Sequence, residues 1–291
     1  MTLRQRTLAP LCALGFLIAL APSAARAQSE VVDPREPVYQ EGPLTAAIGD
    51  IAEIELGGAY LFFDAPNTAK LMELMENPAG GNELAVVMPK DNGGWFIVFQ
   101  FDEIGYVPDD EKDELDADAM LESMIAGAEA SNEQRRARGW SEYNLIGWTE
   151  KPHYDERTNN LSWTLEGESE GHRNLNRMVK LLGRHGVMTA TLVSSPDHMN
   201  VATVATNDLL DQFHYSAGNT YAEYEAGSDK LAQYGLTALV VGGAGAALAK
   251  SGLLAKMWKP IAAVLVAFGA GIKRFFSNGR SSDHDPTKPI G

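Results

Sequence analysis

The chain is almost without cysteine. Among its 291 residues there is one, Cys12, which lies within an apolar stretch near the N-terminus. All residues that follow this stretch therefore lack a thiol. The absence excludes disulfide bonds, thiolate nucleophiles, iron–sulfur clusters and cysteine-ligated zinc from the folded part of the chain. A domain of this kind must be stabilised by its hydrophobic core.

The N-terminus also lacks an apolar run long enough to cross a membrane. Arg4 and Arg6 precede the apolar stretch Leu8–Ala21, and the small-x-small sequence Ala25–Ala27 follows it. This order is typical of a secretory signal peptide, so we predict cleavage after a signal at residues 1–27. An uncleaved anchor is the disfavoured alternative, because the stretch is shorter than the ~20 residues that a spanning helix needs.

Basic residues are few. Lysine and arginine number 24 against 39 acidic residues, which gives a net charge of −15. Removal of the signal peptide takes away three arginines and leaves 21 basic residues, for a net charge near −18. Affinity for nucleic acid comes mainly from clustered lysine and arginine, so the composition excludes nucleic acid as a partner. It also disfavours contact of the domain with anionic lipid surfaces.

The rest of the chain divides into four parts by composition. Residues 28–43 are rich in proline and acids and predict an extended lead-in. Residues 44–227 are uniform in composition and long enough for one domain. Residues 228–276 predict a membrane-anchor region of one or two helices, and residues 277–291 a disordered tail.

Hydrophobic periodicity within the domain predicts an α+β fold, in which helices lie on an antiparallel sheet meander. Alternating or compact apolar segments predict strands at 51–56, 60–63, 83–88, 94–101, 143–152, 161–168, 174–182 and 186–194. Helical spacing predicts helices at 67–76, 116–138 and 195–214. We expect Ser194 and Ser195 to cap the last of these helices, ahead of Pro196.

Four stretches together resemble one protein family. Residues 42–276 are similar to the bacterial membrane-anchored proteins called DUF2167, whose function is unknown. The family brings no catalytic residues to carry over. The order of elements also resembles the α/β sandwich of PsbP and Mog1-like domains. The stretches that carry the family resemblance are EGPLTAAIGDIAEIELGGAYLFF, YDERTNNLSW, LNRMVKLLGRHGVM and YAEYEAGSDKLAQYGLTALVVGG.

The acidic run at residues 109–118 has carboxylates at alternating positions, a pattern that hard cations such as calcium use. It lacks the glycine and the distal glutamate of an EF-hand loop. The alternative is a solvated linker whose last acids lie at a helix N-terminus, where negative charge is favoured. We favour the linker.

Two further kinds of chemistry receive little support. The histidines show no metal-ligand spacing of the HExxH type, and no Gly-x-Ser-x-Gly sequence marks a hydrolase nucleophile. A zinc site would have to be assembled from separate strands. The residue types of a Ser–His–Asp set are all present, but no serine lies in an obvious nucleophile turn, and the sequence implies no cofactor. The histidines concerned are His153, His172, His185, His198 and His214.

One predicted strand carries a candidate ligand site. Arg173 and Arg177 share a face of the strand at 174–182, Lys180 lies opposite, and Arg184 and His185 follow. Arginines can hold a carboxylate or a phosphate through two hydrogen bonds, which predicts a small anionic ligand. The alternative, which we favour, is that they pair with glutamates across the sheet. The glutamates concerned are Glu166, Glu168 and Glu170.

The C-terminal region has two uncharged runs, 15 residues at 235–249 and 13 residues at 260–272, with three lysines between them. Each is shorter than the usual span. In one arrangement both runs enter the bilayer as a hairpin, with the lysines in the cytoplasm. Its helices would be in contact through Gly242, Gly243 and Gly245.

In a second arrangement only residues 253–272 span, with two lysines reaching to the interface, and residues 235–249 lie at the interface or on the domain. A soluble buried hairpin is the third alternative. A phosphate-binding loop is excluded, because the glycines lack the required spacing and follow no strand.

These features together predict a periplasmic α+β module held at the bacterial inner membrane. The sequence favours a non-catalytic role through contact with another envelope protein. The alternatives are a domain that binds a small anionic ligand and an uncharacterised hydrolase.

Overall fold

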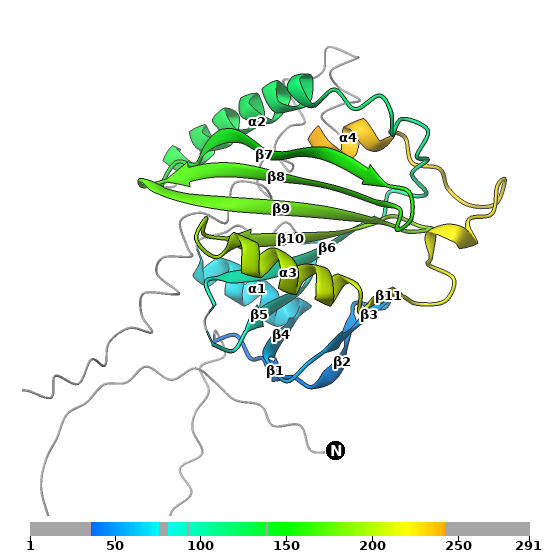
Figure 1. Ribbon diagram of the computed structural model, residues 1–291, viewed down its shortest axis with the longest axis horizontal. Coiled ribbons are helices and arrows are strands. Elements are labelled where there is room, and N and C mark those ends of the chain that lie inside the picture. Colours follow the sequence, from blue (N-terminus) through cyan, green and yellow to red (C-terminus); the bar gives the residue numbers. More distant parts are fainter. Residues whose placement is uncertain (1–35, 76–80, 92, 138, 242–291) are drawn as a thin grey trace, which may run out of the picture.

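The computed structural model describes residues 36–75, 81–91, 93–137 and 139–241 (Figure 1). Several predicted features lie outside these residues and stay predictions: the signal peptide, most of the lead-in, Gly242, Gly243, Gly245 and the segments 253–272 and 277–291.

An eight-stranded antiparallel sheet forms the centre, in the order β1-β4-β5-β6-β10-β9-β8-β7 (Figure 1). Two antiparallel meanders make up this sheet, and they join where β10 pairs with β6. In the first, β4 to β6, helix α1 connects β4 to β5 and a hairpin connects β5 to β6; in the second, β7 to β10, every connection is a hairpin. The antiparallel α+β fold predicted from the sequence is confirmed. In chain order the strands are β1 (Gln40–Glu41), β4 (Tyr60–Asp64), β5 (Glu83–Pro89), β6 (Trp95–Asp102), β7 (Asn144–Asp155), β8 (Asn160–Ser169), β9 (His172–Leu182) and β10 (Val187–Ser194).

A second, three-stranded sheet and the helices surround this centre. The small sheet has the order β11-β3-β2. Its strands are β2 (Leu44–Ile48), β3 (Ala52–Leu56) and β11 (Phe213–Tyr215). The α-helices are α1 (Ala65–Leu74), α2 (Ala117–Ala137), α3 (Met199–Leu210) and α4 (Leu236–Val241), and a 3-10 turn, η1, covers Tyr221–Glu223.

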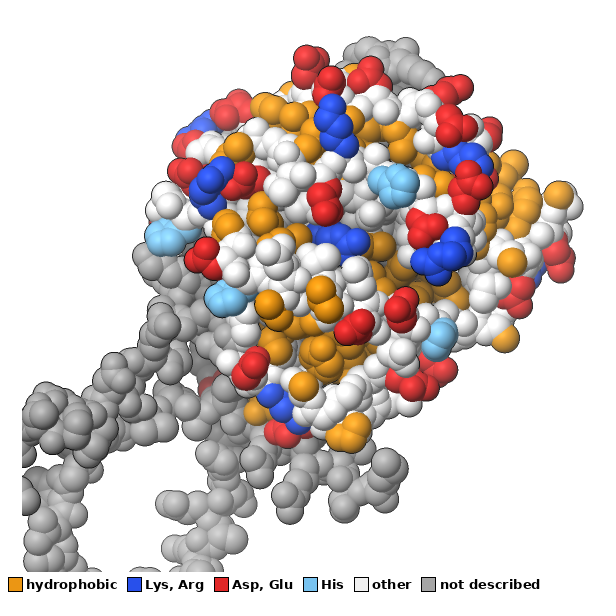
Figure 2. All heavy atoms as spheres, viewed as in Figure 1, with side chains coloured by type: hydrophobic (Ala, Val, Ile, Leu, Met, Phe, Trp, Pro, Cys, Tyr) orange, Lys and Arg blue, Asp and Glu red, His pale blue; other side chains and the backbone are white. Residues whose placement is uncertain are grey.

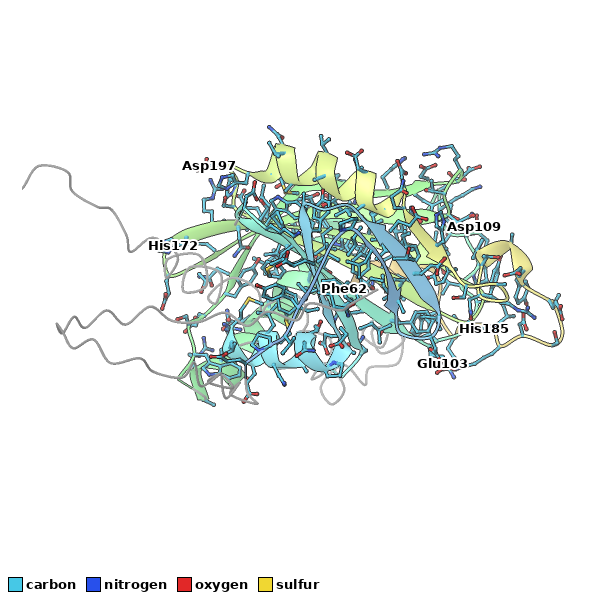
Figure 3. All side chains as sticks on the ribbon, turned by 90° about the horizontal axis from the view of Figure 1, so that it is seen from below. Phe62, Glu103, Asp109, His172, His185 and Asp197 are labelled. Carbon is cyan, nitrogen blue, oxygen red and sulfur yellow. The ribbon has the colours of Figure 1, made fainter. Side chains whose placement is uncertain are left out.

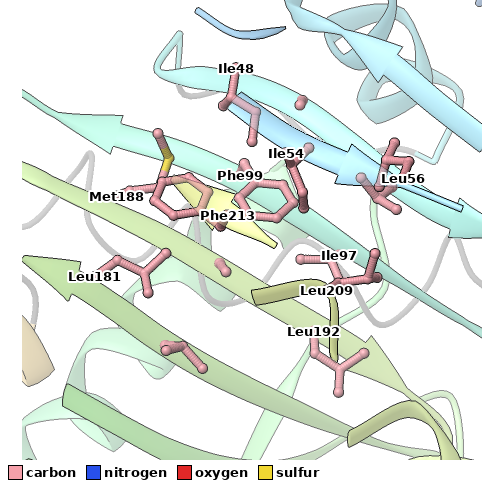
Figure 4. Packing of buried hydrophobic residues seen from close by; sticks show 14 of the residues in the cluster. Ile48, Ile54, Leu56, Ile97, Phe99, Leu181, Met188, Leu192, Leu209 and Phe213 are labelled. Atoms are coloured by element: carbon pink, nitrogen blue, oxygen red, sulfur yellow. The ribbon is translucent and has the colours of Figure 1, made fainter. Parts of the chain in front are cut away.

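The large sheet has two covered faces. We call the face that contacts α3 and the small sheet the α3 face, and the opposite one, which contacts α1, α2 and α4, the α2 face. On the α3 face, apolar side chains from both sheets and from α3 interdigitate (Figure 4). Phe99 of the large sheet stacks on Phe213 of the small one, with ring centroids 6.2 Å apart. The eight residues of β10 are all buried, because both of its faces are covered.

Two large apolar clusters lie on the α2 face, besides a small one in which Ala128 of α2 packs on Tyr143. One joins α1 to β4, β5 and β6 through residues such as Phe63, Leu71 and Phe96. The other joins α2 and α4 to β8 and β9 through residues such as Trp163 and Leu239. Between the two clusters, Gln100 of β6, Thr189 of β10 and Lys180 of β9 lie on this face in register, because alternate residues of a strand share a face.

The predicted helix at 195–214 is wrong at both ends. Helix α3 begins at Met199, its N-cap is His198, and this cap makes no side-chain hydrogen bond. The serines expected to cap it do not: Ser194 Oγ donates to the carbonyl of Ser195 instead. At the other end, Phe213 leaves the helix and enters β11, because its ring is buried between the two sheets.

Besides β11, two strands were not predicted. Residues 40–41 of the predicted lead-in pair with β4, and residues 44–48 pair with β3 as β2. Strand β2 alternates between exposed and buried positions, but three of its five side chains are alanine or threonine. Alanine is a poor strand former, so the pattern is weak at the level of sequence.

Helix α4 lies in the first part of the uncharged run 235–249, for which one prediction was insertion into the membrane. Leu236, Ala238, Leu239 and Val240 are buried against the α2 face and the helix α2. Among the arrangements predicted for 235–249, the one in which the run packs on the domain agrees with the position of residues 236–241. Within the described residues, no helix combines the length and the apolar character that a membrane crossing requires.

Two glycines are expected to respond in opposite ways to alanine. A Cβ on Gly186 would lie 2.1 Å from the backbone oxygen of Asp102, whereas one on Gly127 in α2 would meet nothing within 4 Å. We expect Gly127→Ala to raise the free energy of unfolding by about 0.5–1 kcal/mol. We expect Gly186→Ala to lower it by roughly 1–3 kcal/mol, because backbone must move. Urea unfolding measures both, and equal effects would contradict the structure.

Candidate functional site

Four segments distant in sequence meet at one end of the large sheet, which we call the loop end: residues 102–112, 154–159, 183–186 and 216–235 (Figure 1). Isolated bridges join Tyr106 to Leu231 and Gly183 to Thr220. Figure 3 shows Glu103, Asp109 and His185 grouped at this end. Three of the four stretches that carry the family resemblance contribute to it.

Three tyrosines stack at the loop end. The ring of Tyr106 lies 4.5 Å from that of Tyr221 and 3.8 Å from that of Tyr224, with interplanar angles of 17° and 15°. All three are half-buried. The hydroxyl of Tyr221 donates to the backbone oxygen of Val107, which fixes the stack to the segment after β6. Burial raises the pKa of Tyr221 above its usual value.

Arg184 connects the turn after β9 to residues 216–235. Its Nε and Nη2 donate to the two carboxylate oxygens of Asp229 at 2.7 and 3.0 Å, and Glu225 lies 3.6 Å away. Hydrogen bonding to Arg184 lowers the pKa of Asp229 and raises that of Arg184. A paired geometry of this kind is among the stronger charge-assisted contacts. Asp229 thus accepts from the two guanidinium donors of Arg184 that an anionic ligand would need.

Tyr154 joins the turn between β7 and β8 to the same end. Its hydroxyl donates to Asp109 Oδ2 at 3.1 Å and accepts from Asn159 Nδ2 at 3.1 Å. Burial raises the pKa of Tyr154 to about 12. The hydroxyl is therefore protonated near neutral pH and serves as a structural contact.

The acidic run 109–118 acts in helix capping. Asp116 Oδ1 accepts from the backbone nitrogens of Asp118 and Ala119 at the start of α2. Glu111 Oε2 accepts from the backbone nitrogen of Thr237, in the first turn of α4. The contacts of Asp116 agree with the favoured interpretation, a linker whose last acids lie at a helix N-terminus. No group of three or more histidine, cysteine or acidic side chains in the described part of the chain is arranged to hold a metal ion.

The predicted basic residues do not form one site. Arg173 and Arg177 lie on the α3 face of β9, whereas Arg184 and His185 follow the far end of the strand. At the rise of an extended strand, Arg184 is roughly 35 Å from Arg173 and roughly 23 Å from Arg177. Figure 3 shows His172 and His185 at opposite ends of the molecule. His185 is exposed, and its backbone oxygen accepts from Gly105.

The two arginines on the α3 face contact neighbouring side chains. Arg173 Nε lies 2.6 Å from Glu166 Oε1, the ion pair expected in the favoured alternative. Arg177 Nη1 donates to Asn207 Oδ1 on α3 at 2.9 Å, and its Nε lies 3.8 Å from Glu150. Burial lowers the pKa of Arg177, against the effect of Glu150.

A serine and a histidine do meet, but within one turn. Ser195 Oγ lies 2.9 Å from His198 Nδ1, just before α3. Among the contacts of the described residues, no carboxylate holds the other ring nitrogen of His198. The third member that orients a catalytic histidine is therefore missing from this part of the chain. The five histidines named in the sequence are all exposed.

Sequence reasoning missed the central residues of the loop end. It did not single out Tyr106, Tyr221 and Tyr224 as a group, nor Asp229 as the partner of Arg184. The signal was present in the stretch YAEYEAGSD, which holds two of the tyrosines and the aspartate. Nothing in the sequence itself brings residue 106 beside this stretch, because that contact depends on the way the two meanders join.

The described residues define a mixed α/β domain with a large antiparallel sheet and an ordered loop end. Comparison with protein families gives a match over residues 40–272 to the protein of unknown function DUF2167. The match covers most of the chain, so the chain belongs to the DUF2167 family. No curated protein is significantly similar to it.

Several solved structures show a distant similarity. The solution structure of cyanobacterial PsbP (CyanoP) from Synechocystis sp. PCC 6803 is 14% identical with a TM-score of 0.33, covering 60% of this chain and 100% of that one. The apo immunity protein TplEi of the type VI secretion system from Pseudomonas aeruginosa is 11% identical with a TM-score of 0.26, covering 57% and 46%. The Tle4–Tli4 complex matches at 8% identity and a TM-score of 0.25, covering 62% and 77%. Similarity at this level transfers no function.

The Arg184–Asp229 pair predicts acid sensitivity of the loop end. Because the pKa of Asp229 is lowered by folding, its contribution to stability is present above about pH 4 and is lost as the pH falls through the folded value. We expect Asp229→Asn to destabilise the domain at pH 7 and to reduce the loss of stability between pH 5 and 2. Urea unfolding across this range measures both effects. Glu114→Gln, at an exposed position, serves as the control.

Proposed function

We propose that this chain is a non-catalytic protein-binding module of the bacterial envelope, and that the loop end contacts the partner. The observation that carries the proposal is the stack of Tyr106, Tyr221 and Tyr224 beside Leu231, a residue that is 52% exposed. Tyrosine is enriched in protein interfaces, where its ring supplies a large contact area and its hydroxyl tolerates water.

The loop end is held in place before any partner arrives. The contacts of Arg184 with Asp229, of Tyr154 with Asp109 and of Tyr221 with Val107 tie its segments together. An ordered surface loses less conformational entropy on binding than a loose loop does. The same contacts engage the charged groups of Arg184, Asp229 and Asp109, so these groups are not free to act in catalysis.

The two alternative functions have less support. An anionic ligand would require the arginines to converge, but Arg184 is about a strand length from Arg173 and is engaged by Asp229. A hydrolase would require an orienting acid for His198. On the face shown in Figure 2, acidic and basic side chains are interspersed among apolar ones, which suits a polar protein contact.

We also infer that residues 1–27 export the domain and that residues 253–272 hold it at the inner membrane. The support is the apolar character of both segments, together with the position of α4. Because Leu236–Val241 belongs to the domain core, the first helix of a membrane hairpin would have to lose this contact. The single-span arrangement avoids that loss, and it leaves the domain in the periplasm and the C-terminus in the cytoplasm.

The interface is tested by site-specific photocrosslinking in cells. A photoreactive residue at Leu231 is expected to give one discrete adduct, whereas the same residue at Val201, 69% exposed on α3, is expected to give none. We expect Tyr224→Ala to weaken binding of the crosslinked partner about tenfold or more, the loss that truncation of a tyrosine at the centre of an interface causes. Adducts of equal yield at both positions, or at neither, would rule out the loop end as the interface.

The topology is tested by cysteine labelling, which is simple because the predicted mature chain has no cysteine. Under the single-span arrangement, Asp285→Cys is protected from a membrane-impermeant maleimide in cells with a permeable outer membrane. Ala226→Cys, at an exposed position of the domain, is labelled and serves as the control. Equal labelling at the two positions would instead support the hairpin.

A further inference from the structure

A lysine lies on the α2 face near the centre of the sheet, away from the loop end. Lys180 on β9 stands directly opposite Thr189 on β10, which in turn stands opposite Gln100 on β6. The Nζ of Lys180 donates to Thr189 Oγ1 at 2.7 Å and lies 3.9 Å from Asp102 Oδ2. The side chain therefore extends across β10 toward β6.

Three further side chains continue this arrangement, which we call the Lys180 network. Asp102 Oδ1 accepts from Asn82 Nδ2 at 2.8 Å. Gln100 Nε2 donates to Asn82 Oδ1 and to Glu83 Oε1, each at 3.3 Å. The contacts run from Lys180 through Asp102 and Asn82 to Gln100. Lys180 and Gln100 flank Thr189, one on each neighbouring strand of the ladder.

The network is incomplete between its two ends. Gln100 is only 3% exposed, and its Oε1 is buried without a hydrogen-bond partner in the described part of the chain. An ammonium group has three donors, and among the described residues one acceptor, Thr189 Oγ1, lies at normal hydrogen-bond distance from Lys180 Nζ. A buried acceptor without a partner costs about 1–3 kcal/mol, so this site favours an occupant that completes the network.

The charges of the network limit what that occupant can be. Lys180 brings one positive charge, and Asp102 and Glu83 bring two negative ones. A further anion would be repelled by these carboxylates, and a cation would have no lone pair for Lys180. A neutral group that both accepts and donates fits the open position, and alcohols and carboxamides are such groups. Burial lowers the pKa of Lys180, so an added acceptor also stabilises its charged form.

The network is accessible from one side. The Asp102 side chain is 39% exposed and that of Lys180 is 13% exposed, whereas Gln100 at the other end is enclosed. Tyr234 lies near enough to Asp102 for the carboxylate to contribute to its raised pKa. The network also lies between the two apolar clusters of the α2 face, which border it on both sides.

We propose that the Lys180 network binds a small neutral molecule through a hydroxyl or carboxamide group, which accepts from Lys180 Nζ and donates to Gln100 Oε1. This site is separate from the loop end and does not depend on the protein-binding role. Its apolar borders favour a ligand with an aliphatic part on either side of the polar group.

Nuclear magnetic resonance of the side-chain amide of Gln100 tests the site, with acetamide, glycerol and sodium acetate as probes. We expect saturable shifts with acetamide or glycerol at affinities on the order of millimolar, as suits probes of so few atoms. Acetate is expected to give none. The acetamide and glycerol titrations show which of the two groups the site prefers.

Two variants locate the effect. Lys180→Met keeps the length of the side chain and removes a buried charge, so the fold is expected to persist, while the shifts weaken at least tenfold. Lys112→Met, at a lysine paired with Glu156 in the linker before α2, is expected to leave the shifts unchanged.

Three results would overturn the proposal. They are the absence of saturable shifts with both neutral probes, equal affinity in Lys180→Met, or acetate binding as strong as that of acetamide. If the Lys180→Met domain fails to fold, Gln100→Met replaces it, with unchanged affinity measured at the Asn82 amide as the contrary result. An ordered water that completes the network and that no probe displaces would likewise show a structural role only.

Discussion

Strands β6 and β10 pair over eight residues, from Val187 opposite Asp102 to Ser194 opposite Trp95. This one ladder joins two meanders that are separate in sequence. It places the α3-face core between the sheets and brings Gln100 opposite Thr189 in the Lys180 network. It also fixes the loop end, where the backbone nitrogen of Gly105, just past β6, donates to the oxygen of His185, just before β10. A ladder between strands so distant in sequence carries a high cost in loop-closure entropy, and the burial of β10 on both faces offsets it.

Much of the fold is predictable from local pattern, because side-chain period and burial agree in most elements. Strand β3 is an example: Ala52, Ile54 and Leu56 are buried while Glu53 and Glu55 are exposed, as alternation predicts. Prediction fails where burial comes from distant contacts. Residues 213–215 read as the end of a helix, and only their partners Phe99 and β3 make them a strand.

The candidate site shows the same limit more strongly. Arg173, Arg177 and Arg184 are close in sequence. An extended strand rises by about 3.3 Å for each residue, so Arg184 lies far in space from the other two. The tyrosines and Asp229 are far from their partners in sequence, and no local pattern pairs them. Similarly, the uncharged run after Gly235 has the composition of either a core helix or a membrane helix. The contact of Leu239 with the α2 face separates these alternatives for its first part.

Helix α4 is fastened at its start by the carboxylate of Glu111, which accepts from the backbone nitrogen of Thr237 across 126 residues of sequence. Its apolar side lies against α2 and the large sheet. The last described helix of the chain is thus packed on the domain core up to Val240. A pulling force applied at Val241 would load α2 and the sheet directly, so that mechanical tension and the order of the domain are coupled at this point.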